Sequence, residues 1–373
     1  MASSIDVNSG LAKAFQGKRI FITGHTGFKG SWLSIWLKEL GAEVLGYSLE
    51  PPSVPNNFDV TRLSGKVIHT QGDIRNYPYL IKFFKKFEPE IVFHLAAQPI
   101  VRHSYDNPRE TYETNVMGTI HMFEAIREAS SVRAFINVTT DKCYENKEWL
   151  WGYRENDALG GHDPYSSSKA CAELVSQAYI KSFFALRNDT GIASVRAGNV
   201  IGGGDWGADR LLPDCFRALS QGNQIALRNP QAVRPWQFVL EPLYGYLVLA
   251  GKLCERPAEY TGAWNYGPGN DCCIPVREVV NKIIHYWGSG SWHAASRESN
   301  DHKQEMTLLK LNSDKAYSLL GWRGVLNIDT AIAMTTNWYK TFYQRSGADM
   351  YAFCVEQIAE YMQRIPGMRQ YEL

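Results

Sequence analysis

The sequence predicts an α/β protein in which a doubly wound parallel sheet is followed by a smaller, irregular α/β domain. Three observations predict this fold class. Short apolar runs alternate with helical patterns over the first 195 residues or so. A glycine-rich turn joins the first apolar run to the first helix. Beyond Arg196 the alternation ends, and glycine, proline and tryptophan residues interrupt the pattern.

Composition excludes several functional classes. The chain has 373 residues, 45% hydrophobic and 21% charged, with a formal net charge of +1, so nothing favours nucleic acid or a membrane surface as partner. Its seven cysteines form no CxxC pair and no metal-ligand spacing, which predicts reduced thiols, a cytoplasmic location and no metal site. Met1–Gln16 lacks the apolar core of a signal peptide, and the longest apolar stretch, Leu243–Ala250, is too short to cross a bilayer.

The first element is the apolar strand Lys18–Thr23, which follows a loosely held extension over residues 1–17. The turn after it places glycines at 24, 27 and 30, and a helix carrying Trp32, Trp36 and Leu40 comes next. Such glycines let the backbone approach a pyrophosphate at the helix N-terminus. A tight turn with close packing would use the same residues, but the position between a strand and a helix favours dinucleotide binding.

The remaining elements continue the alternation. Strands are expected at 43–48, 66–70, 90–95, 133–138 and 191–196, and long helices at 109–129 and 164–180. Residues 1–195 should therefore form a dinucleotide-binding Rossmann domain. Residues 196–235 and 263–373 should form the smaller substrate domain, with helices near 276–286, 330–345 and 351–364, while 236–262, a strand and a helix, should return to the first domain.

Two polar clusters carry candidate chemistry. Thr139, Thr140, Asp141 and Lys142 follow the apolar strand 133–138, where open α/β sheets bind ligands. Tyr165 and Lys169 are four residues apart at the start of a predicted helix, so both lie on one face. Alone, these residues could be a turn cap, a half-buried aromatic and a solvated charge.

With these motifs in order, the chain resembles the extended short-chain dehydrogenase/reductase family. The resemblance covers nearly all of residues 18–330 and is carried by the glycine turn and by the segments Gly72–Arg75, His94–Ala97, Asn115–Gly118 and Tyr165–Lys169. Within that family the chain is most similar to nucleotide-sugar 4,6-dehydratases, in particular those acting on CDP-glucose. That closer likeness is carried by the segments Gly24–Trp32, Thr140–Tyr144, Arg196–Trp206 and Pro235–Pro242.

The resemblance implies a hydro-lyase that converts CDP-D-glucose to CDP-4-keto-6-deoxy-D-glucose and water, for deoxysugar and O-antigen biosynthesis. Tyr165, with its pKa lowered by Lys169, takes the C4 hydroxyl proton, and Thr140 orients that hydroxyl. Asp141 is the acid toward the C6 oxygen, provided burial keeps it protonated. Internal hydride transfer uses NAD, which leaves no net oxidation.

Lys142 departs from the wider dehydratase pattern, which has a glutamate as C5 base at this position. The dehydratases acting on CDP-glucose show the same lysine. A lysine acts as a base only when burial or nearby positive charge lowers its pKa. Lys142 is therefore a candidate either for the C5 base or for electrostatic support of the enolate.

NAD is expected rather than NADP, because no arginine or lysine follows the second strand until Arg62 to meet a 2′-phosphate. The candidate cofactor residues are Gly24, Thr26, Gly27, Phe28, Lys29, Gly30, Ser48, Asp73, Ile74, Ala96, Ala97, Gln98, Asn115, Thr139, Tyr165 and Lys169. Tight packing is the alternative explanation for the alanines.

Arginines are suited to a nucleoside diphosphate, and the candidate substrate residues are Ser104, Asn199, Arg210, Arg228, Arg234, Asn265 and His302. The long helices at 109–129 and 164–180 resemble those that form a homodimer interface in this family, so a homodimer or dimer of dimers is expected. Two alternatives stay open: another nucleotide-sugar dehydratase or 4-epimerase, and a catalytically silent NAD-binding interaction protein. Asp141 argues against an epimerase, and Thr140, Tyr165 and Lys169 argue against a silent protein.

Overall fold

The computed structural model describes residues 10–187, 189–295 and 309–366. Its centre is a seven-stranded sheet in the order β11-β6-β5-β4-β1-β2-β3, in which all neighbouring strands are parallel. The strands are β1 (Arg19–Thr23), β2 (Glu43–Ser48), β3 (Ile68–Gln71), β4 (Ile91–His94), β5 (Ala134–Val138), β6 (Gly191–Arg196) and β11 (Gly262–Asn265). The predicted doubly wound parallel sheet is confirmed.

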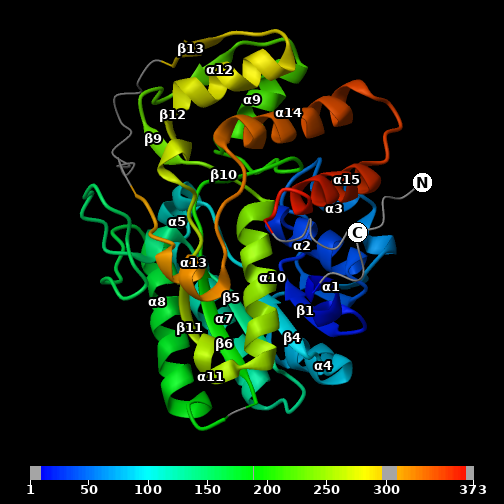
Figure 1. Ribbon diagram of the computed structural model, residues 1–373, viewed down its shortest axis with the longest axis vertical. Coiled ribbons are helices and arrows are strands. Elements are labelled where there is room, and N and C mark those ends of the chain that lie inside the picture. Colours follow the sequence, from blue (N-terminus) through cyan, green and yellow to red (C-terminus); the bar gives the residue numbers. More distant parts are fainter. Residues whose placement is uncertain (1–9, 188, 296–308, 367–373) are drawn as a thin grey trace.

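The sheet is apolar on both faces because helices cover both of them. In β1, Ile20 and Ile22 belong to one buried cluster and Phe21 to the other. The first face lies under α2 (Phe28–Glu39) and α10 (Leu240–Glu255), and the second under α4 (Tyr77–Phe87), α7 (Gly118–Arg127) and α8 (Pro164–Tyr179) (Figure 1).

Two sequence expectations differ from the structure. The helix expected over 109–129 is divided into α6 (Pro108–Tyr112), a π-helical segment (Glu113–Met117) and α7. Residues 1–17 were expected to be loosely held, but within them α1 (Gly10–Phe15) is a helix that buries Leu11, Ala12 and Phe15. Three apolar residues on a single turn make this short segment amphipathic, and it packs against α10.

The remaining elements lie between the strands of the large sheet or follow the last of them. In the first half they are α3 (Asn57–Val60), a 3-10 turn (Leu63–Gly65), α5 (Val101–Asp106), a 3-10 turn (Asp141–Cys143) and a π-helical segment (Ile180–Phe184). In the second half they are β7 (Val200–Ile201), α9 (Leu211–Ser220), β8 (Ile225–Leu227), β9 (Val233–Pro235), β10 (Gln237–Phe238), α11 (Pro257–Tyr260), a 3-10 turn (Asn270–Cys272), β12 (Cys273–Pro275), α12 (Val276–Trp287), β13 (Trp292–Ala294), α13 (Asp314–Leu320), α14 (Ile328–Gln344) and α15 (Met350–Met362).

The second half of the chain builds a lobe beyond one end of the sheet, containing α9, α12 and α14 (Figure 1). The strands described in this lobe form two-stranded pairs, β8 with β13 and β9 with β12. The chain also returns to the sheet, since α10 packs on β5 and β6, and β11 is an edge strand. Residues 263–265, assigned from sequence to the smaller domain, are thus part of the large sheet.

Strand order reverses between β1 and β4, which are neighbours although β2 and β3 intervene in the sequence. The loops leaving the carboxyl ends of these two strands diverge, and the crevice they leave is where doubly wound folds bind ligands. No helix in the part of the chain that the structure describes is long and apolar enough to cross a membrane.

Candidate active site

The glycine turn after β1 is shaped for close approach of an anion. Gly24 has φ of +77°, and a Cβ there would lie 2.7 Å from the Ala96 amide nitrogen. A Cβ at Gly30 would lie 2.1 Å from the Gly24 carbonyl oxygen. Gly27 is the N-cap of α2, and no side chain caps the first amides of that helix, Phe28 and Lys29 among them. Free amides and the helix dipole fit a pyrophosphate group.

The end of β2 closes the next side of this site. The Thr26 hydroxyl donates to the Leu49 carbonyl at 3.0 Å and lies 2.8 Å from the Ser48 hydroxyl oxygen. The hydroxyl of Ser48, a predicted cofactor residue, thus has a protein partner. Ile74, also predicted to contact the cofactor, is buried against Gly118, and its carbonyl oxygen lies 2.8 Å from His121 Nδ1.

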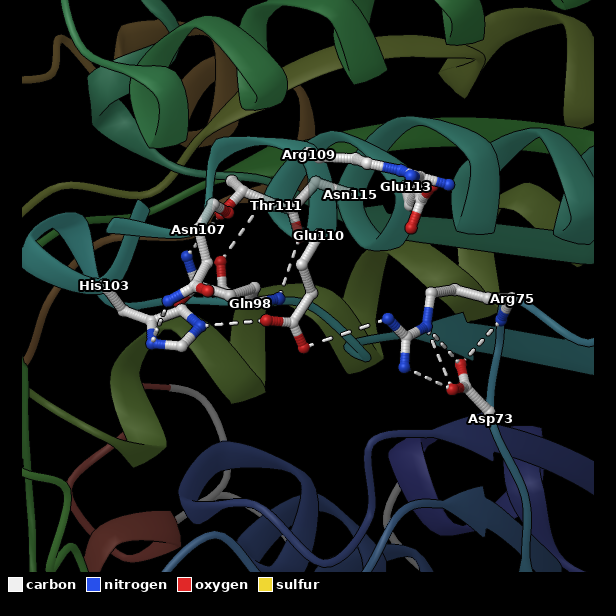
Figure 2. Close-up of polar contacts among 10 residues, drawn as sticks. All are labelled: Asp73, Arg75, Gln98, His103, Asn107, Arg109, Glu110, Thr111, Glu113 and Asn115. Atoms are coloured by element: carbon white, nitrogen blue, oxygen red, sulfur yellow. Dashed lines mark hydrogen bonds and ion pairs between the residues drawn. The ribbon is translucent and has the colours of Figure 1, made fainter. Parts of the chain in front are cut away.

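Asp73, a predicted cofactor residue, is held in place by Arg75. The Arg75 guanidinium donates to both carboxylate oxygens, from Nε to Oδ1 at 3.1 Å and from Nη2 to Oδ2 at 2.6 Å, and lies 3.8 Å from Glu110 (Figure 2). Burial raises the Asp73 pKa, but the hydrogen bonds and charge of Arg75 lower it by more than burial raises it, so the net shift is downward. Asp73 is therefore an anchored carboxylate, and the tie between Arg75 and Glu110 joins the β3 loop to α6.

Asn115 fixes the loop that leaves β4 (Figure 2). Its Oδ1 accepts from the Gln98 amide at 2.8 Å, and its Nδ2 donates to the Gln98 carbonyl at 3.1 Å and to Ser168 Oγ at 2.9 Å. The Gln98 side chain donates to Thr111 and Ile100. Asn115 and Gln98, both predicted cofactor residues, thus hydrogen-bond to protein partners through their side chains. These bonds hold the loop that carries Ala96 and Ala97.

A buried hydrogen-bond relay supports the same loop from beneath. The Ala96 amide donates to Thr23 Oγ1 at 3.2 Å, and Thr23 Oγ1 lies 2.7 Å from His94 Nδ1. On the other ring side Thr119 lies 3.4 Å from Nε2 and donates to the Asn115 carbonyl. Burial, and then the charge of Lys169, lower the His94 pKa to about 3, so this imidazole is neutral. Thr119 gives its hydroxyl proton to the Asn115 carbonyl, so its oxygen can only accept from His94. The ring hydrogen of His94 is therefore on Nε2.

The catalytic candidates gather at the carboxyl end of β5. Thr140 donates to Asp141 Oδ1 at 2.9 Å, and its hydroxyl also hydrogen-bonds with Tyr165. Tyr165 is placed by the start of α8, where Asp163 accepts from the Ser166 amide at 2.9 Å. Burial raises the Tyr165 pKa to about 12, while the Thr140 hydrogen bond and the charge of Arg210 act downward. Without further positive charge, this phenol stays protonated at neutral pH.

Asp141 is a buried carboxyl, 4% exposed. Burial raises its pKa, and the charges of Lys142 and Lys29 and the bond from Thr140 oppose that shift without cancelling it. Its carboxyl lies directly against Gly198, where a Cβ would come within 1.8 Å of Oδ2. The expected protonatable carboxyl therefore sits in a site that admits only glycine beside it.

Two buried ammonium groups face this cluster. Burial lowers the Lys169 pKa to about 8, while Glu173 acts upward. Burial also lowers the Lys29 pKa to about 8, and Lys169 and Arg210 add to that shift while Asp141 opposes it. Lys29, predicted only as part of the glycine turn, therefore also belongs to the charge cluster around Asp141. Lys142 joins it through its amide, which donates to Thr140 Oγ1 at 3.3 Å.

A buried ion pair lies one helical turn beyond Lys169. Arg196 donates to both Glu173 oxygens, at 2.9 Å from Nε and 2.8 Å from Nη2, and both side chains are at most 1% exposed. Thr139, predicted to contact the cofactor, donates its hydroxyl to the same carboxylate at 2.5 Å. Glu173 was missed from sequence, although its spacing of four from Lys169 places it on the same helix face.

Of the predicted substrate arginines, the structure brings Arg210 to the cluster. Its charge acts on Lys29 and Tyr165, and its Nη1 donates to Asp205 at 2.8 Å. Arg228 is exposed and donates to Asp209 at 2.8 Å. Arg234 donates to the Val233 carbonyl at 3.0 Å. Asn199 lies in a left-handed turn with φ of +49°, beside Gly198.

Two predicted substrate side chains have other partners. Asn265 is fully buried, donates to the carbonyls of Tyr153 and Asn312 and accepts from the Tyr144 hydroxyl. Both polar atoms of its side chain thus have protein partners, and a substrate contact at Asn265 stays a prediction. Ser104 is also fully buried, donating to the Val101 carbonyl and accepting from the Tyr165 amide. Its hydroxyl supports the start of α8, and a substrate contact at Ser104 stays a prediction. The last such residue, His302, lies outside the described residues.

The fold and site together define a class, the extended short-chain dehydrogenases/reductases that act on nucleotide sugars. A family model described as GDP-mannose 4,6 dehydratase matches residues 21–335. The chain belongs to that family. It is also 47% identical over 353 residues to a CDP-glucose 4,6-dehydratase of Salmonella typhimurium, an alignment that covers 93% of this chain and 97% of that relative.

Solved structures agree on the fold. An epimerase of Methanothermobacter thermautotrophicus, Mth375, superimposes with a TM-score of 0.77 at 23% identity, covering 90% of this chain and 97% of that one. The dTDP-glucose 4,6-dehydratase DesIV of Streptomyces venezuelae, solved with NAD and TYD bound, gives a TM-score of 0.74 at 22% identity, covering 87% and 99%.

Proposed function

We propose that the protein is an NAD-dependent CDP-glucose 4,6-dehydratase, a hydro-lyase that forms CDP-4-keto-6-deoxy-D-glucose and water. The observation that carries the proposal is the buried carboxyl of Asp141. It accepts a hydrogen bond from the Thr140 hydroxyl, which also hydrogen-bonds with Tyr165. A hydride-transfer site needs only Tyr165, Lys169 and a hydroxyl; an acid beside them adds elimination of water. The likeness to the Salmonella dehydratase supports CDP-glucose as the substrate.

The first half of the reaction uses Tyr165. NAD, held at the glycine turn after β1, would supply the hydride acceptor for C4 and the hydride donor for C6, with C5 regaining a proton as C6 is reduced. Thr140 orients the C4 hydroxyl, and Tyr165 takes its proton as the carbonyl forms. The ammonium of Lys169 stabilises the phenolate that this transfer requires, since a pKa near 12 is too high for a base at neutral pH.

The second half uses Asp141 and Lys142. The C4 carbonyl acidifies C5, whose proton leaves to a base while the electron pair forms the enolate. Asp141 donates its proton to the C6 oxygen, and water departs. Burial favours the protonated carboxyl before this step. Lys142 is the candidate for taking the C5 proton or for stabilising the enolate, because its charge acts directly on Asp141.

A single assay tests the function. The protein is incubated with NAD and CDP-glucose, and the 4-keto product is followed by its absorbance in alkali and by a mass loss of one water. CDP-glucose should be converted faster than dTDP-glucose, UDP-glucose or GDP-mannose, and Tyr165→Phe should be at least about 100-fold slower. Absence of product, or isomerisation without water loss, contradicts the proposal.

The role of Lys142 is tested by Lys142→Met. If Lys142 serves the C5 step, turnover should fall by about 100-fold and solvent deuterium should enter C5 correspondingly slowly. Lys147→Met, a change of an exposed lysine in the following loop, is the matched control. Full turnover with normal C5 exchange in Lys142→Met would show that the assignment is wrong.

A homodimer and a cytoplasmic location complete the proposal. Tyr112, Met117 and Leu174 are 37%, 43% and 54% exposed on the adjoining helices α6 to α8, an apolar surface that supports pairing of two copies. All seven cysteines are unpaired, as predicted from their spacing, which agrees with a reducing compartment.

A further inference from the structure

The inward face of α8 carries three ionisable residues in succession. Tyr165, Lys169 and Glu173 are spaced by four and are 8%, 6% and 1% exposed. Ionisable groups persist at such depth only where partners stabilise them, because burying an unpaired charge is costly. Tyr165 and Lys169 have proposed roles in hydride transfer, whereas no reaction step uses Glu173.

The Glu173 carboxylate is fixed from two directions. The guanidinium of Arg196 on β6 donates to both oxygens, and the Thr139 hydroxyl at the end of β5 donates to Oε1 at 2.5 Å. Bidentate pairing with arginine fixes the plane of a carboxylate as well as its position. Glu173 therefore presents a negative charge of fixed direction below Lys169.

The charge of Glu173 raises the Lys169 pKa against the effect of burial, and Lys169 Nζ donates to the Val138 carbonyl at 3.3 Å. The groups facing Lys169 come from several elements: Lys29 on α2, His94 on β4, Cys143 after β5, and Glu173 on its own helix. Among the described residues, only Glu173 and Cys143 raise the Lys169 pKa. Burial raises the Cys143 pKa well above its usual value, so that thiol is uncharged. His94 is neutral, and the ammonium of Lys29 is repelled by that of Lys169, which lowers the Lys29 pKa.

We propose that Glu173 is a positioning residue for the hydride step: its carboxylate, held by Arg196 and Thr139, keeps the buried Lys169 protonated beside Tyr165. The inference rests on the roles proposed above for Tyr165 and Lys169. Loss of the Glu173 charge leaves Lys169 with burial and positive neighbours alone. Lys169 then releases its proton at lower pH, and Tyr165 loses the ammonium that stabilises its phenolate.

A purely structural role for the ion pair is the competing explanation. Arg196 also donates to the Tyr144 hydroxyl at 2.6 Å and to the Glu155 carbonyl at 3.0 Å, which ties α8 to the loop after β5. Removal of one partner of a buried pair is strongly destabilising, whereas removal of both is often tolerated. Stability and the protonation of Lys169 can therefore be separated.

The test compares Glu173→Gln with the double variant Glu173→Gln/Arg196→Met, which removes both charges. Competitive acetylation at a series of pH values, read by mass spectrometry on the peptide containing Lys169, measures the protonation of that amine without cofactor or substrate. The midpoint should lie near pH 8 in the unmodified protein and about one unit or more lower in both variants. The alkaline limb of the kcat profile should move in the same direction.

Tyr144→Phe is the matched control, since it removes another bond of Arg196 and leaves Glu173 charged. It should lower the unfolding midpoint and leave the Lys169 midpoint unchanged. The proposal is overturned if the folded double variant keeps the Lys169 midpoint of the unmodified protein. Because the labelling needs no substrate, its result stands even where the unmodified protein fails to convert CDP-glucose, an outcome that refutes the proposed function alone.

Discussion

At the scale of single residues, the site depends on side chains that lie within contact of one another across distant segments. Asp141 follows β5, and Gly198 follows β6, yet the carboxyl of one occupies the space where the other would carry a Cβ. A glycine here has nothing to do with backbone freedom, because its φ is not positive. It provides room for the Asp141 carboxyl, the group proposed above as the acid of the dehydration.

Gly198→Ala should therefore lower kcat strongly. The added Cβ would lie 1.8 Å from Asp141 Oδ2, so the carboxyl must turn away from Thr140, and we expect a loss of about 100-fold in dehydration. Steady-state assay with CDP-glucose measures it. Gly65→Ala is the control, since a Cβ there meets nothing within 4 Å. Equal activity of the two variants would contradict the proposed place of Asp141.

At the scale of elements, α10 links the large sheet to the C-terminal helices through one buried carboxyl. Glu241 accepts from the amides of Val325 and Leu326 at 2.9 and 2.7 Å and from the Tyr361 hydroxyl on α15 at 2.9 Å. Burial raises its pKa to about 7, although those hydrogen bonds act downward. The segment before α14 and the helix α15 are thus attached at the same group.

This attachment should make stability depend on pH. The folded state binds the Glu241 proton more tightly than the unfolded state, so its contribution is full below pH 4.5 and is lost as pH rises through about 7. The change should be on the order of 3 kcal/mol in the free energy of unfolding. Urea unfolding between pH 4.5 and 8 measures it.

Glu241→Gln, which cannot ionise, isolates this contribution from other titrating groups. As the pH rises from 4.5 to 8, the unmodified protein should lose unfolding free energy relative to the variant. A constant difference would show that Glu241 ionises in the folded state as it does in the unfolded chain.

At the scale of the whole molecule, the two faces of the sheet differ in what covers them. One side packs through α2 and α10 into the C-terminal lobe and forms one continuous apolar core. The other side carries α7 and α8, and Met117, just before α7, and Leu174 on α8 are exposed there. The active-site residues of α8 face the sheet, so pairing through the outer surface leaves the site intact.

Leu174→Arg should weaken the proposed homodimer, because two unpaired charges would be buried in the interface. Sedimentation velocity should show a shift from dimer to monomer at micromolar concentration. Leu319→Arg on α13 is a matched control, since both leucines are 54% exposed. If the unmodified protein sediments as a monomer, or if the variant pairs as well as the control, the interface lies elsewhere.

The sequence by itself determined the alternation of strands and helices, and therefore the parallel sheet. The periods of its apolar residues and the glycines at 24, 27 and 30 are local features that need no tertiary contact to be recognised. Tyr165, Lys169 and the strand-end polar residues follow from the same local logic. Weak local patterns were misread: the α1 helix was overlooked, and the helix over 109–129 was expected to be uninterrupted.

Only the tertiary structure decided which polar groups stay open to ligands and which serve the protein. Asn265 donates to the carbonyls of Tyr153 and Asn312, and Ser104 accepts from the Tyr165 amide. Glu173 accepts hydrogen bonds from Arg196 and Thr139. The physical reason is that hydrogen bonding and burial depend on partners far away in the chain, 23 residues for Glu173 and Arg196 and 112 for Asn265 and Tyr153, and spacing along the sequence carries no record of them.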